Sequence, residues 1–547
     1  MVTIKRNIMK TLKSLFAVLI ILIGSSCSSF LETEPEDFLS PEFFYNNEEQ
    51  INTALVGIYN KMSDTRNGAP LYSSAYFTFM GTEGDDGFYR KGPERNLPGQ
   101  FLYNASAPHV ANLWRALYEG VNLANIMLEK LDGADMDDDK REIVRGETLF
   151  LRAYYFFLLI SNYGNIPLPL KSTVTPDFNE MEQASPARVY QQITKDMEKA
   201  YGLVPTATQV GFGGRVNKSA VAGILARVYL YWAGEPIKDV SKYHNARDWA
   251  FTVISSGEHE LNPSFDDVFR RLAADEYDIK ESIWEVEFYG NRTDRPRQAG
   301  MLGNYIGIYN DNHPQIGNSN ANIWGSGRLY QLYKAGDSRR DRTLAPFIYS
   351  PSSSNIESPL AATAIWTRYP GKYRRSEETF LPKSTGYTPI NFPLLRYSDV
   401  LLMYAEAENE INGPTTDAVK YFNMVRRRAF GFPYNDAALL VPNPVSDLED
   451  DDKSDKLSFL LAIQDERSRE LAFECLRKYD LVRWGIYVSS MKALSNLYLT
   501  STTPSTPSAQ ARTVAEALGM ITDRHKLLPI PTHEMMLNRK LVQNPGW

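Results

Sequence analysis

Apolar residues recur along the chain at the spacing of one helical face. Val121, Ala124, Leu128 and Leu131 follow the i, i+3/i+4, i+7 pattern. The stretch 141–164 is apolar on most faces, which indicates a central buried helix, and it ends at a glycine followed closely by prolines. This pattern predicts a mainly α-helical protein.

Further helical segments come in pairs joined by short turns. Ser185 and Pro186 form a helix cap and a first-turn proline, and Asn412-Gly413 separates two later segments. The predicted helices are 186–203, 218–232, 245–254, 397–411 and 414–429. Recurring pairs of this kind predict a TPR-like helical-repeat scaffold, an α/α superhelix with little β-structure.

Four long stretches lack this periodicity. They are 64–108, 288–328, 343–393 and 485–520, and they are rich in Gly, Pro, Asn, Ser, Asp and aromatic residues. Irregular loops of this length in a compact protein are usually functional. We therefore expect long irregular ligand-binding loops between the helix pairs.

The first residues predict export. Residues 1–26 comprise a basic region up to Lys13, the nine apolar residues LFAVLIILI and a small-residue run from Gly24. Nine apolar residues are fewer than the about 20 that a membrane-spanning helix needs. Cys27 follows directly, as in a bacterial lipobox, which predicts lipidation of its thiol, although Gly24 stands where Leu is usual. An ordinary signal peptide followed by a chance cysteine is the alternative.

Charge and motifs exclude several classes of function. The net charge is -7 and the chain has no basic stripe, so we expect no nucleic-acid partner. The chain has no phosphate-binding glycine loop, no G-x-S-x-G and no H-E-x-x-H, and its six histidines are scattered singly. We expect a protein that is not an enzyme and has no cofactor and no catalytic metal. A pair of carboxylates across a cleft, as in a glycosidase, is an alternative that the composition leaves open.

Charged residues in the C-terminal half alternate in sign at helical spacing. Residues three or four apart on a helix face one another, so opposite charges at this spacing favour ion pairs, and apolar neighbours indicate that some are buried. We expect pairing here rather than acid–base catalysis. The set is Arg396, Asp399, Glu406, Glu466, Arg467, Glu470, Glu474, Arg477, Asp480 and Arg483.

Ordered blocks over nearly the whole chain resemble the SusD/RagB family. FLETEPEDFLS after Cys27 is similar to the family's entry into the mature chain, and QINTALVGIYNKM to its first helix. The other blocks are LWRALYEGVNLANIMLEKL (113–131), GETLFLRAYYFFLLISNYGNIPL (146–168), GRVNKSAVAGILARVYLYWA (214–233), LLRYSDVLLMYAEAENEIN (394–412), ERSRELAFECLRKYDLVRWG (466–485) and LLPIPTHEMMLNRKLVQNPGW (527–547). Cys475, which helix periodicity predicts to be a buried small hydrophobe, replaces the family's usual Gly.

The resemblance implies a function and a domain plan. It implies a lipid-anchored, surface-exposed outer-membrane protein that captures oligosaccharide or polysaccharide and delivers it to a SusC-like TonB-dependent barrel. Residues 1–26 would be the signal peptide, and regions 27–285 and 286–547 would pack as one globular unit. Two alternatives are the same scaffold capturing peptides or another nutrient, and a lid for the transporter with no ligand of its own.

Two loops have the composition of a sugar site. A sugar offers apolar C–H faces and a rim of hydroxyls, so its site needs exposed aromatic rings with polar groups at their edges. Trp324 is the foremost candidate, because a Trp in a Gly/Asn/Ser-rich loop is a poor core builder. The alternative is that each ring anchors its loop to the core and that Asp85-Asp86 only cap a turn. The candidates are Tyr72, Tyr76, Asp85, Asp86, Phe88, Tyr89 and Arg90 in 71–96, and Tyr305, Tyr309, Asn310, Asn312 and Trp324 in 288–324.

Overall fold

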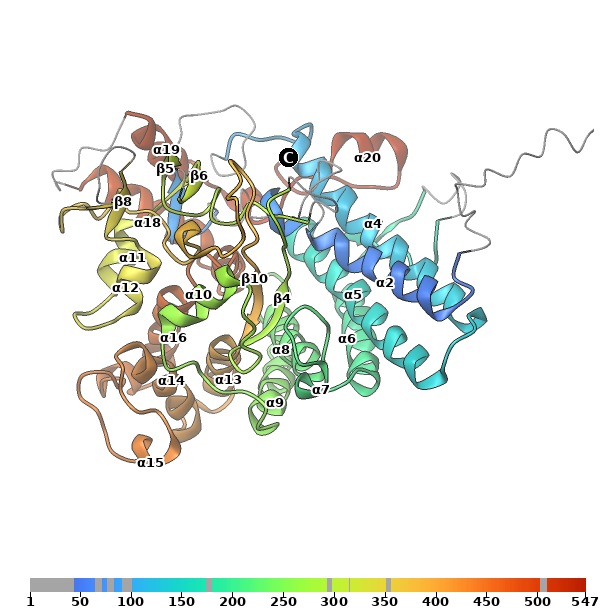
Figure 1. Ribbon diagram of the computed structural model, residues 1–547, viewed down its shortest axis with the longest axis horizontal. Coiled ribbons are helices and arrows are strands. Elements are labelled where there is room, and N and C mark those ends of the chain that lie inside the picture. Colours follow the sequence, from blue (N-terminus) through green and yellow to red (C-terminus); the bar gives the residue numbers. More distant parts are fainter. Residues whose placement is uncertain are drawn as a thin grey trace, which may run out of the picture.

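Antiparallel helices make up most of the fold in the computed structural model (Figure 1). The structure describes residues 44–63, 71–75, 83–90, 101–173, 180–292, 298–313, 315–350, 356–501 and 509–547. The predicted signal peptide and Cys27 lie outside these residues. Among the described residues, no helix combines the length and the apolar character that crossing a membrane requires.

The N-terminal helices stack in chain order. Each of them packs against the next, as the blue-to-green ribbons of Figure 1 show. This stacking of consecutive helices confirms the predicted helical-repeat scaffold. The helices are α2 (Glu48–Ser63), α4 (Pro108–Lys130), α5 (Asp138–Tyr163), α6 (Pro186–Leu203), α8 (Lys218–Ala233) and α9 (Lys242–Ser255).

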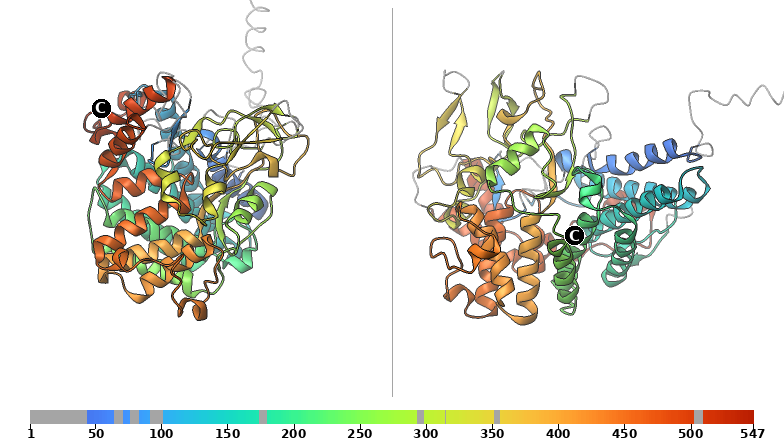
Figure 2. Two further views of the ribbon diagram at one scale, coloured as in Figure 1. Left: turned by 90° about the vertical axis from the view of Figure 1, so that its left-hand side faces the viewer. Right: turned by 60° about the horizontal axis from the view of Figure 1, so that its bottom comes forward.

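The C-terminal half continues the same stack. Helix α13 (Tyr397–Asn412) packs against α9, α14 (Thr416–Ala429) and α16 (Lys456–Leu471). Figure 2 shows the yellow strand pairs and loops gathered on one side of these helices. The shorter helices are α7 (Ala207–Val210), α10 (Phe265–Ala274), α11 (Gly327–Leu332), α12 (Arg339–Thr343), α15 (Asp436–Leu439), α17 (Arg477–Arg483) and α20 (Thr532–Leu537).

The prediction of an irregular stretch at 485–520 is wrong. This part of the chain contains α18 (Tyr487–Leu499) and α19 (Ala509–Gly519), which pack against each other. Tyr487, Met491 and Leu494 are buried at helical spacing, so the segment has a helical apolar face.

The strands in the described residues form two-stranded antiparallel pairs only. β1 (Gly87–Tyr89) pairs with β7 (Ile323–Gly325), and β4 (Ser282–Val286) pairs with β10 (Phe392–Arg396). The remaining pairs are β2 (Ile166–Pro167) with β3 (Gln183–Ala184), β5 (Asn310–His313) with β6 (Gly317–Ser319), and β8 (Phe347–Tyr349) with β9 (Glu357–Pro359). One short hairpin therefore lies within each of the two long stretches 288–328 and 343–393.

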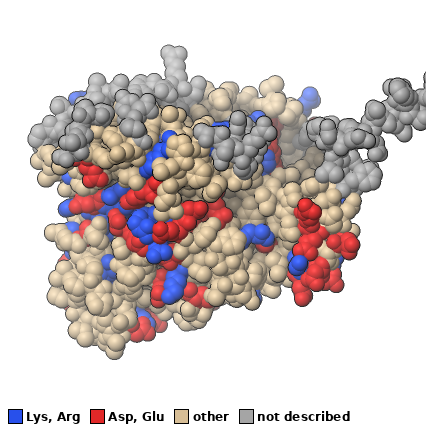
Figure 3. Space-filling view, viewed as in Figure 1, with Lys and Arg blue, Asp and Glu red and all other residues tan. Residues whose placement is uncertain are grey.

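Acidic residues surround the start of α5. Asp137 caps the helix by accepting a hydrogen bond from the Lys140 amide at 3.1 Å, and Asp138 and Asp139 follow in the first turn. Negative charge at this end is favourable because it faces the positive end of the helix dipole. Figure 3 shows the resulting acidic patch at the right-hand end of the visible face.

The main hydrophobic core draws on both halves of the chain. It extends from Ile51 on α2 to Leu541 near the C-terminus, and α5 is buried on most faces. Cys475 is buried, as predicted, and its backbone has a φ of 60°. This left-handed conformation suits glycine better than cysteine, which explains the Gly expected here from the family resemblance.

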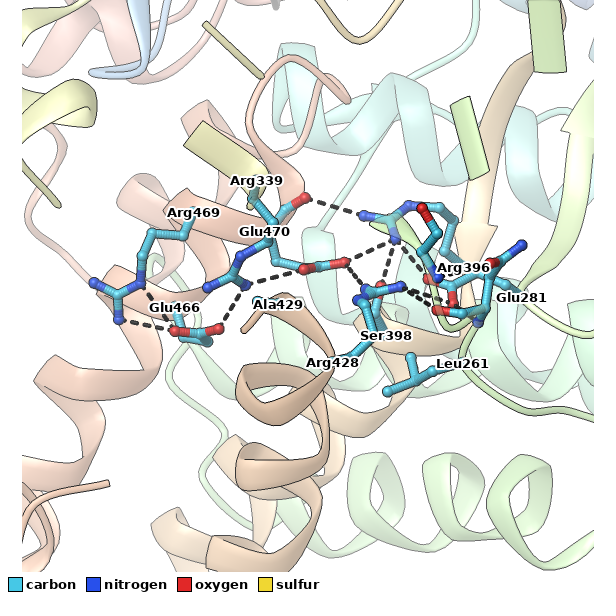
Figure 4. Close-up of polar contacts among 12 residues, drawn as sticks. Leu261, Glu281, Arg339, Arg396, Ser398, Arg428, Ala429, Glu466, Arg469 and Glu470 are labelled. Carbon is cyan, nitrogen blue, oxygen red and sulfur yellow. Dashed lines mark hydrogen bonds and ion pairs between the residues drawn. The ribbon is translucent and has the colours of Figure 1, made fainter. Parts of the chain in front are cut away.

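A network of ten buried charges crosses the interior, and Figure 4 shows the part of it around Glu466 and Glu470. Glu470 lies at its centre and accepts from Arg428 at 2.5 Å, Arg396 at 2.9 Å and Arg339 at 3.0 Å. Five cations face five carboxylates, so the connected set is neutral. The cations are Arg339, Lys372, Arg396, Arg428 and Arg469, and the carboxylates are Glu281, Asp337, Glu466, Glu470 and Glu474.

A second group of predicted pairs is buried beside this network. Arg467 contacts Asp399 at 2.7 Å and Asp480 at 2.8 Å. Arg483 contacts Glu406 and, at 2.8 Å, Asp480. The prediction that these alternating charges pair in the interior is confirmed, but most of the partners come from other segments, and of these pairs only Arg483 and Asp480 are at helical spacing.

Glu285 on β4 is a buried carboxyl that forms no ion pair with any described residue. Burial, with Glu287 nearby, raises its pKa to about 8. The folded protein therefore keeps a proton that the unfolded chain releases above its usual pKa of 4.5. A raised carboxyl pKa makes stability fall as pH rises between these two values.

Glu285→Gln should remove this dependence, because the amide mimics the protonated acid. As pH rises from 5 to 8, the wild type should lose stability and the variant should not. The unfolding free energy of the variant should therefore rise by about 2–4 kcal/mol relative to that of the wild type over this range. Urea unfolding followed by circular dichroism across this range measures the difference. The exposed Glu182→Gln variant is the control and should run parallel to the wild type. A difference in unfolding free energy between Glu285→Gln and wild type that stays constant from pH 5 to pH 8 would contradict the prediction.

Candidate functional site

Three aromatic rings surround the guanidinium of Arg90. Its Cζ lies 5.0 Å from the ring centre of Tyr309, 5.8 Å from that of Tyr369 and 5.9 Å from that of Trp324. The Tyr309 and Tyr369 rings are nearly parallel, with centres 6.3 Å apart. We call Arg90, Tyr309, Trp324 and Tyr369 the ring cluster. Arg90, Tyr309 and Trp324 are half-buried, so the cluster keeps exposed ring surface.

Backbone hydrogen bonds bring three distant segments together at the ring cluster. Phe88 of β1 stands opposite Trp324 of β7, and the Arg90 amide donates to the Asn322 carbonyl at 2.8 Å. The Gly325 amide donates at 2.8 Å to the carbonyl of Arg368, the residue before Tyr369. Trp324, Tyr369 and Arg90 are therefore held by the β1–β7 pair and its neighbouring segment rather than by a free loop.

Main-chain carbonyls fix the Arg90 side chain. Its Nε donates to the Ala321 carbonyl at 2.9 Å, and Nη2 donates to the Asn320 carbonyl at 3.0 Å. Among the described residues, no carboxylate forms an ion pair with Arg90 and Nη1 has no hydrogen-bond partner. A cation held against ring faces in this way is stabilised by the rings' negative quadrupoles. The cluster thus offers flat apolar surface beside a charged hydrogen-bond donor.

The structure places Asp85 and Asp86 in the interior rather than on a binding surface. Asp85 accepts from Arg477 Nε at 2.6 Å, and Asp86 accepts from the Ser468 hydroxyl at 2.7 Å. Burial alone would raise the pKa of Asp85, but Arg477 and Arg328 hold this pKa below its usual value. Burial and the charge of Asp85 raise the pKa of Asp86 to about 6. These carboxyls anchor the segment that leads into β1 and so position Arg90.

Several predicted ligand residues are also interior. The Tyr72 hydroxyl lies 2.6 Å from that of Tyr154 and its ring stacks on Phe392. Phe88 and Tyr89 are buried on β1, and Asn310 is fully buried beside Gly317. These side chains are buried and so offer almost no surface to a ligand.

The other predicted residues lie in three different situations. Arg90, Tyr309 and Trp324 meet in the ring cluster, and Tyr305 is half-buried, with its carbonyl bound by the Asn322 amide at 2.9 Å. Tyr76 and the side chain of Asn312 lie outside the described residues.

Sequence reasoning missed Tyr369. Burial raises the pKa of its hydroxyl, while Arg90 acts to lower it. The sequence feature that could have identified Tyr369 is the aromatic-rich run IWTRYPGKY, which lies inside the stretch 343–393 that is predicted to be a functional loop. Among the described residues, no group of three or more His, Cys, Asp or Glu side chains is placed to hold a metal ion.

Comparisons with known families match both halves of the chain. Residues 321–547 match the model of the SusD family. Residues 29–230 match a family model described as starch-binding and associating with the outer membrane.

Similar proteins cover nearly the full length. A SusD-like protein of Formosa agariphila is 24% identical over 98% of this chain and 98% of that protein. The crystal structure of a SusD homolog from Bacteroides thetaiotaomicron is 27% identical, with a TM-score of 0.81 over 93% of this chain and 98% of that chain. Surface glycan-binding protein A from the same species, in complex with laminarihexaose, is 22% identical with a TM-score of 0.68 over 91% of this chain and 100% of that chain. At 22% identity, the similarity to surface glycan-binding protein A is a similarity of fold.

Proposed function

Since the chain belongs to the SusD/RagB family, we propose that it is a glycan-binding lipoprotein of the cell surface. It captures oligosaccharide or polysaccharide and delivers it to a SusC-like TonB-dependent transporter in the outer membrane. The observation that carries the proposal is the ring cluster, which sets Trp324 and Tyr309 beside the charge of Arg90, for which the described residues provide no ion-pair partner. A solved relative of the same fold was crystallised with laminarihexaose, which supports a sugar as the ligand.

The cluster has the two properties that a sugar ring requires. The apolar C–H face of the sugar packs on an aromatic ring, and its hydroxyls accept from Arg90 Nη1. A hydrogen bond to a charged group contributes about 1.5–3 kcal/mol, and the covered ring surface adds about 25 cal/mol per Å². Because Arg90 is already held by two carbonyls, little further ordering is needed when a ligand binds.

Binding rather than catalysis fits the chemistry of the cluster. Glycoside hydrolysis needs two carboxyl groups on either side of the scissile bond. The ring cluster, as far as the structure describes it, consists of a cation and three rings, and the nearby Asp85 is bound to Arg477. Attachment through a lipidated Cys27 would keep the binding surface at the membrane, in agreement with the outer-membrane association in the family description.

Trp324→Ala tests the proposal. Removal of the ring deletes a sugar-stacking surface, so we expect affinity for the bound glycan to fall about 10- to 100-fold, in keeping with the loss of roughly 1.5–3 kcal/mol for a buried side chain of this kind. Affinity gels with a panel of polysaccharides, followed by calorimetry on the mature chain, measure this change. Trp249→Ala is the matched control, because Trp249 is a half-buried Trp that packs edge-on against Tyr201 in the helical array.

The outcomes separate the competing functions. Unchanged retardation of Trp324→Ala by every polysaccharide that retards the wild type would overturn the assignment of the ring cluster. A wild-type chain that binds oligopeptides and no glycan would support capture of another nutrient. A chain that binds neither class would be a lid for the transporter.

A further inference from the structure

A pocket with a volume of about 500 Å³ lies between α4, the segment 167–173 and α20. Trp114 and Tyr118 of α4 line it, together with Leu170 and Leu537. It shares no residue with the ring cluster. Figure 1 shows α4 and α20 at the right of the molecule, whereas β5, β6 and β8 are at the left. The pocket is thus a separate hollow on the helical array, within the range of about 300–1,000 Å³ that is typical of ligand sites.

The aromatic wall of the pocket is rigid. The rings of Trp114 and Tyr118 have centres 4.8 Å apart, and the Trp114 ring is also held edge-on by Tyr163. The Tyr118 hydroxyl donates to the Pro167 carbonyl at 2.8 Å, which ties α4 to the opposite wall. Because these contacts fix the wall before any ligand arrives, a ligand meets a preformed surface.

Glu534 gives the pocket an acceptor. This half-buried carboxyl forms no ion pair with any described residue, and burial raises its pKa, while His533, a hydrogen bond from Trp114 and the charge of Arg115 act to lower it. A purely apolar ligand would seal Glu534 from water without replacing the lost hydrogen bonds, which is unfavourable. A ligand with hydroxyl groups would donate to the carboxylate instead.

The charges around the pocket balance. Two carboxylates, Glu119 and Glu534, face two cations, Arg115 and Lys171, and Glu119 is also bound by Lys61 at 2.8 Å. A strongly charged ligand would therefore gain no net attraction from this rim. The half-buried ring of Tyr118 packed on buried Trp114, a carboxylate that accepts from Trp114 and keeps further lone pairs, and a rim that is neutral over its described residues together fit an uncharged polyhydroxylated ligand.

We propose that this pocket is a second glycan-binding site that takes one or two neutral sugar rings. The existence of a second site goes beyond the proposed function, whereas the choice of sugar as its ligand rests on that function. Two sites on one chain make binding of a long polysaccharide bivalent, so the chain retains polymers better than short oligomers.

Calorimetry in a background in which the first site is weakened tests the proposal. Trp324→Ala is titrated with neutral hexasaccharides, namely laminarihexaose, maltohexaose, cellohexaose, xylohexaose and mannohexaose. We expect weak residual binding of at least one of them. Adding Leu537→Asp, which places a charge on the half-exposed apolar wall, should reduce the residual affinity at least about 10-fold. Glu534→Gln keeps the shape of the pocket and should reduce it about fivefold.

Met536→Asp is the matched control. Met536 is the neighbouring residue on α20, is exposed and does not line the pocket, so its replacement should leave the residual affinity unchanged. Loss of all hexasaccharide binding in Trp324→Ala alone, or residual binding that Leu537→Asp does not change, would overturn the second site while the proposed function stands. A wild-type chain that binds no glycan would overturn both.

Discussion

Glu470→Gln should lower the free energy of unfolding by about 3–5 kcal/mol. Glu470 is fully buried and contacts Arg339, Arg396 and Arg428. Burial alone would raise its pKa, but the surrounding arginines hold the pKa well below its usual range. The amide removes one negative charge from a set of five cations and five carboxylates, and so leaves an uncompensated positive charge in the interior.

Chemical unfolding of the variant and of Glu260→Gln measures this effect. Glu260 pairs with Lys280 at 2.6 Å, as closely as Glu470 pairs with Arg428, but both Glu260 and Lys280 are exposed. Loss of an exposed pair costs about 0–1 kcal/mol, so the control isolates the contribution of burial. Equal destabilisation of the two variants would show that the network is no more important than a surface pair.

The effect of Glu470→Gln should depend on pH. A depressed carboxyl pKa contributes stability that is fully present above the unfolded value of 4.5 and is lost as pH falls towards the folded value. The difference in unfolding free energy between wild type and Glu470→Gln should therefore be constant near neutrality and should shrink below about pH 4.5.

Asp85→Asn should weaken both the fold and glycan binding. Asp85 is buried against Arg477 and lies 3.3 Å from Arg328, so its neutralisation leaves Arg477 with the more distant Asp86, at 4.0 Å, and should cost about 3–5 kcal/mol. The same carboxylate anchors the segment that leads into β1 and Arg90. We expect glycan affinity to fall about 10-fold or more, because a misplacement of about 1 Å in a preformed site is costly.

Asp196→Asn separates the two effects. Asp196 is paired with Arg152 at 2.7 Å and is buried to a similar degree, but it belongs to α6 in the helical array. This control should lose comparable stability in thermal unfolding and keep its glycan affinity in calorimetry below the unfolding temperature. An Asp85→Asn variant that is destabilised but binds glycan normally would show that the anchor does not position Arg90.

The periodic helices could be predicted from the sequence because their signal is local. The buried face of α5 and the glycine that ends it lie within one stretch of chain, as do the buried positions of α13 and α14. The segment 485–520 carried the same signal in Tyr487, Met491 and Leu494, but its Ser- and Thr-rich neighbourhood suggested a loop. Local composition outweighed periodicity in that interpretation, and periodicity was the better guide.

The candidate site could be predicted only in part, because exposure depends on distant partners. Trp324 and Asp85 lie in loops of similar composition, yet one ring is half-buried and the other side chain is sealed by Arg477, 392 residues away. No local pattern marks such a pairing. Tyr369 was missed for the same reason, because it joins the ring cluster only through a backbone hydrogen bond between its segment and β7.

Arg90 binds the carbonyl of Ala321 across 231 residues of intervening chain. Closure of so long a loop comes late in folding, because local helices form before distant strands meet. The ring cluster therefore does not exist in a chain that has formed only its N-terminal helices, however helical that chain is. Retention on a glycan column would then report how many molecules in a preparation have completed folding, a question that circular dichroism leaves unanswered.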